Sequence, residues 1–147
     1  MIVREATAAD HPIWAEMLAK LHDWGDEAEF IAEIPSWLAL EDPMVCFLAF
    51  TDSGQPIGMV DARVRNYAEG APNLRAAYVE DIWVEEEHRR SGVARALLAA
   101  VEQWARAQGL DWLGSDTELG NDLSEAWHKG AGFKIIERLI VFGKPLE

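Results

Sequence analysis

One junction constrains this chain more than any other feature. It is the run at residues 88–98, which joins a strand-like segment to an amphipathic helix. Residues 77–84, just upstream, are rich in β-branched and aromatic side chains, which favours a strand. Downstream, apolar residues recur at helical spacing; they are Val93, Leu97, Leu98, Val101 and Trp104. The pattern predicts a strand, a turn and a helix that begins just after Gly92.

This turn has the features of a phosphate-binding site. The first N–H groups of a helix have no partner within it, and the helix dipole adds positive charge at the same end. Gly92 lets the backbone approach a ligand closely, and Arg89, Arg90 and Arg95 can pair with phosphate oxygens. The sequence lacks both the Lys-Ser/Thr of a P-loop and the G-x-G-x-x-G of a dinucleotide fold. A solvated basic loop is the alternative interpretation.

The length and composition predict a single domain with a substantial core. A chain of 147 residues buries roughly 70% of its unfolded surface, and an apolar share of 50% argues against disorder. Cys46, which is the only cysteine, lies in an apolar run and is expected to be a buried free thiol in a reducing cytoplasm. No apolar run approaches the ~20 residues that span a bilayer, so no membrane partner is expected.

The charge balance is strongly acidic, with 26 acidic and 13 basic residues and a formal net charge of −13. Nucleic acid is therefore not expected as a partner, because a polyanion prefers a positive surface. An acidic surface raises the local concentration of cationic substrates. Acidity alone can equally serve solubility.

Periodicity and turn residues predict an α/β (α+β) fold with the element order β-α-α-β-β-β-α-β-α-β. We expect strands at residues 2–6, 45–50, 57–65, 77–85, 112–116 and 133–142. The first of four helices starts at a capping signal formed by Thr7 and Asp10, and the others cover residues 27–40, 93–108 and 121–129. Pro35 should kink or divide the second helix. The fourth and fifth strands should pair in parallel within a mixed sheet of about six strands.

A family resemblance adds to this interpretation. Residues 89–94, Arg-Arg-Ser-Gly-Val-Ala, fit the (Gln/Arg)-x-x-Gly-x-(Gly/Ala) loop of the GNAT superfamily of acyl-CoA-dependent N-acetyltransferases, and the element order is similar from end to end. The resemblance implies one domain over residues 1–147 with acetyl-CoA as cofactor and no metal ion. It also implies that the strands at 77–85 and 112–116 splay apart around the thioester arm. The implied cofactor-binding residues are Ile82, Trp83, Val84, Arg89, Arg90, Ser91, Gly92, Val93, Ala94, Arg95, Asn121 and His128.

Two carboxylates are candidates for the chemistry. Transfer to an amine needs the neutral amine, a polarised carbonyl and a proton for the thiolate. Glu80 and Asp116 lie on the strands expected to flank the opening, so they could hold an ammonium group and take its proton. An exposed strand carboxylate is the alternative for each. In a regular strand Asp81 points away from Glu80, so only one of them should face the site.

Two residues of the helix at 121–129 are further candidates. His128 stands where many family members have a tyrosine that is assigned as the acid for the CoA sulfur. Imidazole can donate a proton near neutral pH, but His128 could instead only contact the cofactor. Asn121 resembles an asparagine that contacts the pantetheine arm, and it could also be an N-cap.

Within the superfamily the chain most resembles the aminoglycoside 6′-N-acetyltransferases. The residues that carry this likeness are 79–84, 89–94, 114–117, His128 with Gly132 and Phe133, and the loop around Tyr67. The likeness implies that Glu80 and Asp116 bind the amine to be acetylated. It further implies that the antibiotic is bordered by His22, Trp24, Tyr67 and Glu137. Aminoglycosides are polycations, so the acidic composition fits such a substrate.

The resemblance also implies a homodimer, because related enzymes pair through their C-terminal strands. The alternating pattern at residues 133–142 is compatible with that arrangement. Two alternatives for the function remain open. The chain could acetylate another cationic amine, such as a polyamine, an amino acid or a protein amine, or it could be a non-catalytic acetyl-CoA-binding module.

Overall fold

The structure is a computed structural model that describes residues 1–147. The chain divides into two compact units, residues 1–115 and residues 116–147, and each unit is described by itself. None of the helices combines the length and the apolar composition needed to cross a membrane.

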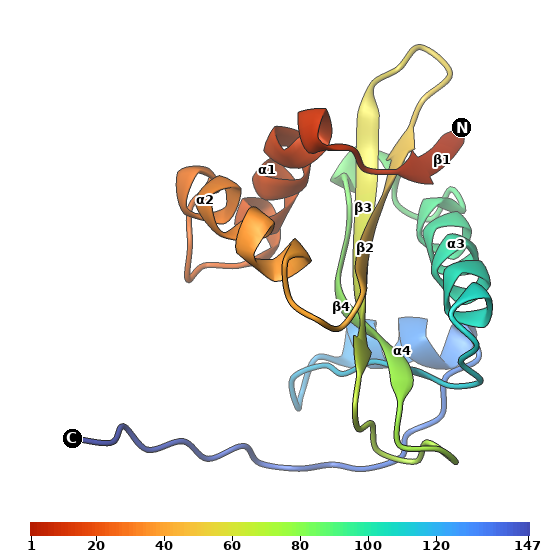
Figure 1. The fold of residues 1–147 in the computed structure, drawn as a ribbon. Coiled ribbons are helices and arrows are strands. Elements are labelled where there is room, and N and C mark those ends of the chain that lie inside the picture. The colour runs from red at the N-terminus through yellow and green to blue at the C-terminus, as the bar shows by residue number, and fades with distance from the viewer. The chain divides into compact units, whose positions relative to one another are not determined.

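The first unit is built on a five-stranded sheet (Figure 1). Its strands pair in chain order; they are β1 Ile2–Glu5, β2 Met44–Phe50, β3 Pro56–Arg65, β4 Ala76–Val84 and β5 Leu113–Gly114. Neighbouring strands from β1 to β4 are antiparallel, whereas β5 is parallel to β4. The expected strands of this region and the parallel pairing of the last two are therefore confirmed, although β5 is shorter than the predicted 112–116.

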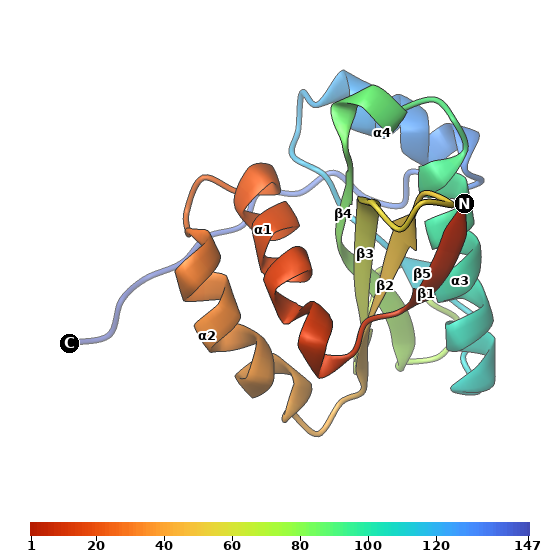
Figure 2. The ribbon, with the colours of Figure 1, turned by 90° about the horizontal axis from the view of Figure 1, so that it is seen from above.

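Three helices cover the two faces of this sheet. The helices α1 His11–Leu21 and α2 Glu27–Leu38 lie on one face, and α3 Val93–Ala107 lies on the other (Figure 2). Two 3₁₀ turns, Ala8–Asp10 and Glu86–His88, precede α1 and the turn before α3. The helix α2 continues through Pro35 and ends two residues before the predicted boundary at residue 40.

Acidic side chains stabilise the starts of the first two helices. The Asp10 carboxylate accepts hydrogen bonds from the Thr7 backbone N–H at 2.8 Å and the Thr7 hydroxyl at 3.0 Å. It also pairs with the Arg4 guanidinium at 2.7 Å. Asp26 is the N-cap of α2, where its Oδ1 accepts from the Glu29 N–H at 2.9 Å. The predicted capping signal is thus confirmed, because orphan N–H groups at a helix start need such acceptors.

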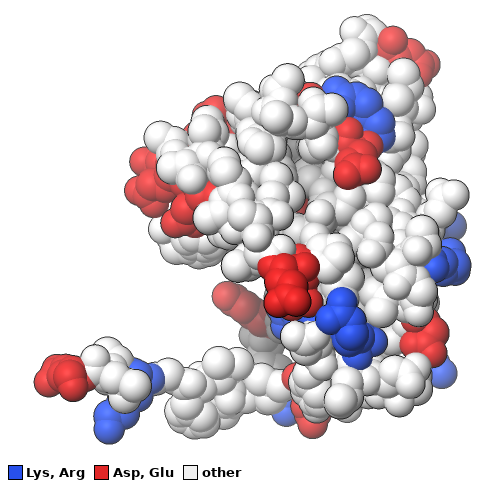
Figure 3. Space-filling model, viewed as in Figure 1, with Lys and Arg blue, Asp and Glu red and all other residues white.

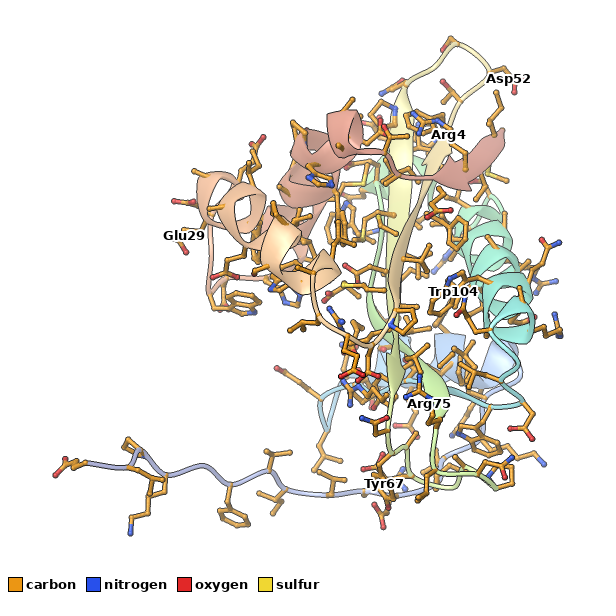
Figure 4. The ribbon with its side chains drawn as sticks, viewed as in Figure 1. Arg4, Glu29, Asp52, Tyr67, Arg75 and Trp104 are labelled. Atoms are coloured by element: carbon orange, nitrogen blue, oxygen red, sulfur yellow. The ribbon has the colours of Figure 1, made fainter.

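The core fills both sides of the sheet. The largest fully buried side chains are Trp14, Phe30, Met17, Leu18, Ile34, Leu48, Met59, Leu97, Val45, Val60, Val64 and Val101. The helix α3 packs closely because residue 58 on β3 is glycine. A Cβ at Gly58 would lie 3.0 Å from Val93 Cγ1 and 3.2 Å from Leu97 Cδ1. Trp104 also points from α3 toward the sheet (Figure 4).

The second unit contains one helix, α4 Asp122–Gly130. Asn121 is its N-cap, and its side-chain oxygen accepts from the Ser124 N–H at 3.2 Å. Residues 133–147 form neither helix nor strand. The predicted strand at 133–142 is therefore wrong for this structure, and the sheet has five strands rather than about six. An alternating apolar pattern makes a segment able to form a strand, but a strand exists only where its backbone finds a hydrogen-bonding partner.

Candidate active site

The turn before α3 contains two left-handed residues, which suit the binding of an anion. Gly92, the N-cap of α3, has φ 89°, and Arg90 has φ 61°, so left-handed residues stand on both sides of Ser91. Left-handed conformations in a short turn bring successive backbone N–H groups into one concavity, which binds anions. Glycine at 92 is required by φ and not by crowding, because an added Cβ would meet nothing within 4 Å.

The first turn of α3 leaves its N–H groups available. The first N–H group of this helix that donates to a backbone carbonyl is that of Ala96, which bonds the Gly92 carbonyl at 3.0 Å. The N–H groups of Val93, Ala94 and Arg95 therefore have no acceptor in the preceding turn. The side chain of Val93 is buried in the core, so this residue offers a ligand only its backbone. These donors fit a diphosphate.

The arginines of this turn divide between two roles. Arg89 Nε donates to the Val84 carbonyl at 3.0 Å, and its guanidinium lies 4.8 Å from the centre of the Trp83 ring. Arg89 therefore ties the turn to the end of β4. Arg90 and Arg95 are exposed and can reach a bound anion.

The strands β4 and β5 part soon after they meet. They pair only at Ala77 with Leu113 and at Tyr78 with Gly114. Beyond that point the edge of β4 has no neighbouring strand on this side, and it carries the half-buried residues Ile82, Trp83 and Val84. An extended ligand could therefore bond the unpaired edge of β4. The pairing of the two strands thus ends within the region where the sheet was expected to open.

A bulge in β4 changes which side chains share a face. Asp61 pairs with Asp81, but Ala62 pairs with Val79, so Glu80 is the extra residue on β4. Asp81 contacts Asp61 of β3, and Glu80 contacts Arg65 of β3. Asp61 and Arg65 are four residues apart in this strand, so their side chains lie on the same face of the sheet. The expectation that only one of Glu80 and Asp81 can face the site assumed a regular strand, and the bulge removes that assumption. The alternation of a regular strand fails at a bulge.

Glu80 has a strong partner within the fold. Arg65 Nε donates to Glu80 Oε1 at 2.8 Å, and the Arg65 NH2 group donates to Oε2 at 2.6 Å. The same guanidinium lies 3.6 Å from the centre of the Tyr78 ring. A carboxylate in a bidentate pair keeps lone pairs for further donors, so Glu80 can still accept from an ammonium group. Sequence reasoning missed Arg65, which only the strand register brings beside Glu80.

A second carboxyl group lies deeper, at Asp61 on β3. It is 0% exposed, and its Oδ2 accepts from Trp14 Nε1 at 2.8 Å. Burial raises the pKa of Asp61 well above its usual value, and the neighbouring charge of Asp81 raises it further. Asp81 in turn bonds His22, with Oδ1 and Nε2 2.5 Å apart. Sequence reasoning did not single out Asp61, although a lone acid in an apolar strand is a signal that could have found it.

Aromatic and acidic side chains border this region of the first unit. The ring of Trp24 is 61% exposed and lies 5.2 Å from the ring of His22. Tyr67, which is 63% exposed, lies in the loop that joins β3 and β4 (Figure 4). Acidic side chains gather over α2 in Figure 3. Four exposed acidic residues lie in the loop between α1 and α2 and at the start of α2; they are Asp23, Asp26, Glu27 and Glu29.

The remaining candidates belong to the second unit. Asp116 lies two residues beyond β5 and is exposed, so it is not on the strand where it was expected. His128 lies on α4, where its Nδ1 bonds the Ser124 carbonyl at 2.7 Å. A neutral His128 therefore carries its hydrogen on Nδ1, and Nε2 donates only when the ring is protonated. Glu137 lies exposed in the segment without secondary structure.

Known proteins are similar to this chain over its whole length. Residues 9–139 match the acetyltransferase (GNAT) family. The chain is 35% identical to the aminoglycoside N(6′)-acetyltransferase type 1 of Stenotrophomonas maltophilia, across 99% of this chain and 94% of that relative. The chain therefore belongs to the GNAT acetyltransferase family.

Two solved structures support the same assignment of the fold. The apo structure of the aminoglycoside antibiotic 6′-N-acetyltransferase AAC(6′)-IG from Acinetobacter haemolyticus has a TM-score of 0.90 and 32% identity, with 100% of both chains covered. AAC(6′)-Iy in complex with the bisubstrate analog CoA-S-monomethyl-acetylneamine has a TM-score of 0.90 and 28% identity, with 99% of this chain and 98% of that chain covered.

Proposed function

We propose that this protein is an acetyl-CoA-dependent N-acetyltransferase that transfers an acetyl group directly to the 6′-amine of aminoglycosides. The observation that carries the proposal is the position of the left-handed turn at Gly92. After a 3₁₀ turn, it follows the stretch of β4 whose edge opposite β3 has no neighbouring strand. The end-to-end similarity to relatives named aminoglycoside 6′-N-acetyltransferases supports the choice of substrate.

The residues proposed to hold the cofactor fit a diphosphate attached to an extended arm. The N–H groups at the start of α3 and the side chains of Arg90 and Arg95 bind the phosphates. The edge of β4 from Ile82 to Val84 bonds the arm, and Asn121 contacts it from α4. Acetyl-CoA, when bound, supplies the acetyl thioester.

Two carboxylates are proposed to recognise the substrate amine. Glu80, whose orientation is fixed by Arg65, and Asp116 accept hydrogen bonds from the ammonium group. His22, Trp24, Tyr67 and Glu137 border the rest of the antibiotic. The acidic side chains near α2 attract a polycation to this face. His128 either donates a proton to the departing sulfur or only contacts the cofactor, and both roles stay within the proposal.

We also propose that residues 1–147 act as one acetyltransferase domain, that the protein is a homodimer and that it works in the cytoplasm. The family match at 9–139 crosses the boundary between the two units, which supports a single domain. Apolar side chains of the C-terminal segment are exposed; they include Ile135, Ile136, Leu139, Ile140, Val141 and Phe142. Such a cluster is typical of a contact surface. The only cysteine, Cys46, is a buried free thiol, which is compatible with a reducing compartment.

A thiol-release assay tests this function. Purified protein with acetyl-CoA is given kanamycin or tobramycin, spermidine, or a peptide that contains lysine. The proposal expects release with the aminoglycosides and a product acetylated at the 6′ nitrogen by NMR. Release only with spermidine or the peptide would replace the substrate class and keep the reaction. Binding of CoA without release from any amine would reduce the protein to a binding module.

A further inference from the structure

Four side chains of the first unit form a continuous polar chain from the core to the surface. Trp14 on α1 donates from Nε1 to Oδ2 of Asp61 on β3. Asp61 faces Asp81, its partner across the β3–β4 pairing, within hydrogen-bonding reach of that carboxyl group. Asp81 Oδ1 then bonds Nε2 of His22, which follows the last residue of α1. The two carboxyl groups, of Asp61 and Asp81, thus connect the Trp14 indole to the His22 imidazole.

This chain requires a proton between its two carboxyl groups. Asp61 Oδ1 is buried and has no donor among the N–H and O–H groups around it. Two ionised carboxylates cannot bond each other, whereas a proton on Oδ1 of Asp61 supplies the missing hydrogen bond to Asp81. Burial raises the pKa of Asp61, as does the charge of Asp81, which favours the protonated form.

The arrangement also fixes the state of the histidine. Asp81, which accepts the hydrogen bond from the protonated Asp61, keeps an acceptor oxygen for His22 Nε2–H. A neutral His22 then carries its hydrogen on Nε2 and its lone pair on Nδ1. The side chain of His22 is 26% exposed and that of Asp81 is 18% exposed, so the ring lies where the chain reaches solvent.

The position of this histidine links it to the proposed substrate amine. Asp81, which anchors His22, directly follows Glu80, which we propose to accept from the ammonium group, and the bulge places both carboxylates on one face of the sheet. His22 also contacts Trp24, whose exposed ring lies in the proposed substrate-binding loop. An amine that arrives as ammonium has to lose a proton before it can attack.

We propose that His22 is the proton acceptor for the substrate ammonium, and that Asp81 and Asp61 are positioning residues that fix its orientation and tautomer. The inference rests on the proposed acetylation of an amine. In the step, the N–H bond of the ammonium breaks and its electron pair stays on nitrogen. The proton forms a bond with Nδ1 of His22, Asp81 stabilises the resulting imidazolium, and the proton later leaves to water.

Several charged groups surround this chain of residues and set its pH response. Cys46 on β2 pairs with Asp61, and burial raises the pKa of its thiol. Glu80 on β4 adds negative charge beside Asp61, and Arg65 offsets it through the ion pair. From α2 the ring of Phe30 faces His22 at 6.3 Å and carries no charge.

The kinetic test compares His22→Gln with His11→Gln, the same substitution at the other end of α1. We expect His22→Gln to lower kcat on the order of 100-fold at neutral pH, with CoA affinity unchanged. The deficit should shrink at high pH, where the amine is already neutral, and added imidazole should restore part of the rate. His11→Gln should behave as wild type. If His22→Gln raises only KM and leaves both kcat and the pH profile of kcat unchanged, His22 is a substrate contact and the proposal is overturned.

The positioning residues are tested by isosteric changes. Asp81→Asn should shift the pH profile of kcat, because an amide cannot stabilise the imidazolium as a carboxylate does, and Asp81→Glu should recover part of the rate. Asp61→Asn should keep the fold and lower kcat less than His22→Gln. An unchanged pH profile in Asp81→Asn would remove both carboxyl groups from the mechanism.

A spectroscopic arm separates this inference from the proposed substrate. Infrared spectra of the wild-type protein should contain the band of a protonated buried carboxyl group that disappears in Asp61→Asn. Imidazole ¹⁵N shifts should show His22 with hydrogen on Nε2. If aminoglycosides are not substrates but spermidine is, the kinetic series is repeated with spermidine. The absence of both spectroscopic signatures would contradict the inference whichever amine is acetylated.

Discussion

Arg65 and Glu80 form a bidentate ion pair beside the bulge of β4, with nitrogen–oxygen distances of 2.8 and 2.6 Å. The carboxylate that the sequence offers as a free anion is therefore already oriented by a cation. Both side chains are partly exposed, so the pair contributes little to stability. Its value lies in holding Glu80 in one direction for the substrate amine.

Replacing Glu80 with glutamine should weaken recognition of the amine and leave cofactor binding intact. We expect kcat/KM for an aminoglycoside to fall about 10- to 100-fold, which corresponds to the loss of one charge-assisted hydrogen bond. CoA affinity by calorimetry should stay at the wild-type value. Arg65→Met should show a smaller loss, because Glu80 keeps its charge and loses its orientation. Wild-type kinetics in both variants would exclude Glu80 from the site.

Replacing Gly92 with glutamate should abolish CoA binding. The added carboxylate would lie in the turn that binds diphosphate, and a side chain at φ 89° is strained. Gly54 offers a matched control, since it has φ 90° in the hairpin turn and also has nothing within 4 Å of an added Cβ. Gly54→Glu carries the same backbone strain and should bind CoA normally. Equal losses of CoA binding in both variants would contradict the phosphate-site assignment.

Removing the Asp10 carboxylate should destabilise the protein at neutral pH. The Arg4 guanidinium holds the pKa of Asp10 well below its usual range, and hydrogen bonds from Thr7 add to the effect. This contribution is present above the unfolded pKa of about 4 and is lost as pH falls from there toward the native pKa. Asp10→Ala should cost about 1–2 kcal/mol in urea unfolding at pH 7. The cost should shrink in acid, and the exposed Asp52→Ala should show no measurable change.

The pH dependence of stability should have the opposite sign for Asp61. Burial and the Asp81 charge raise its native pKa, so the folded protein binds a proton that the unfolded chain releases above about pH 4. Wild-type stability should therefore fall, relative to Asp61→Asn, as pH rises from about 4 through the native pKa. Urea unfolding of both proteins across this range measures the difference. Parallel curves would show that Asp61 ionises normally in the fold.

Charged substitutions in the C-terminal segment should change the assembly state. Ile140→Asp combined with Phe142→Asp should convert the proposed dimer to a monomer in analytical ultracentrifugation, because the exposed apolar side chains would no longer bury surface between two copies. Lys144→Asp, a neighbouring charge change, should leave the mass unchanged. A wild-type protein that sediments as a monomer at all concentrations would refute the dimer.

Most of the fold follows from local sequence signals. The capping residues Thr7 and Asp10, the hairpin turn around Gly54 and the apolar spacing of α3 each act within a few residues, so they predict elements correctly. The pattern at 133–142 failed because a strand also requires a backbone partner, which is not a local property. For the same reason the pattern could not limit β5 to two residues.

The sequence alone determined the strand, the turn and the helix around Gly92, because residue spacing, turn residues and orphan N–H groups are properties of the local chain. Only the tertiary structure decided that Glu80 is held by Arg65 and that Asp61 is linked through Asp81 to His22. These contacts join residues that are distant in the chain, and they depend on strand register and on one bulge. Register is set by the packing of the whole sheet, so no short stretch of sequence specifies it.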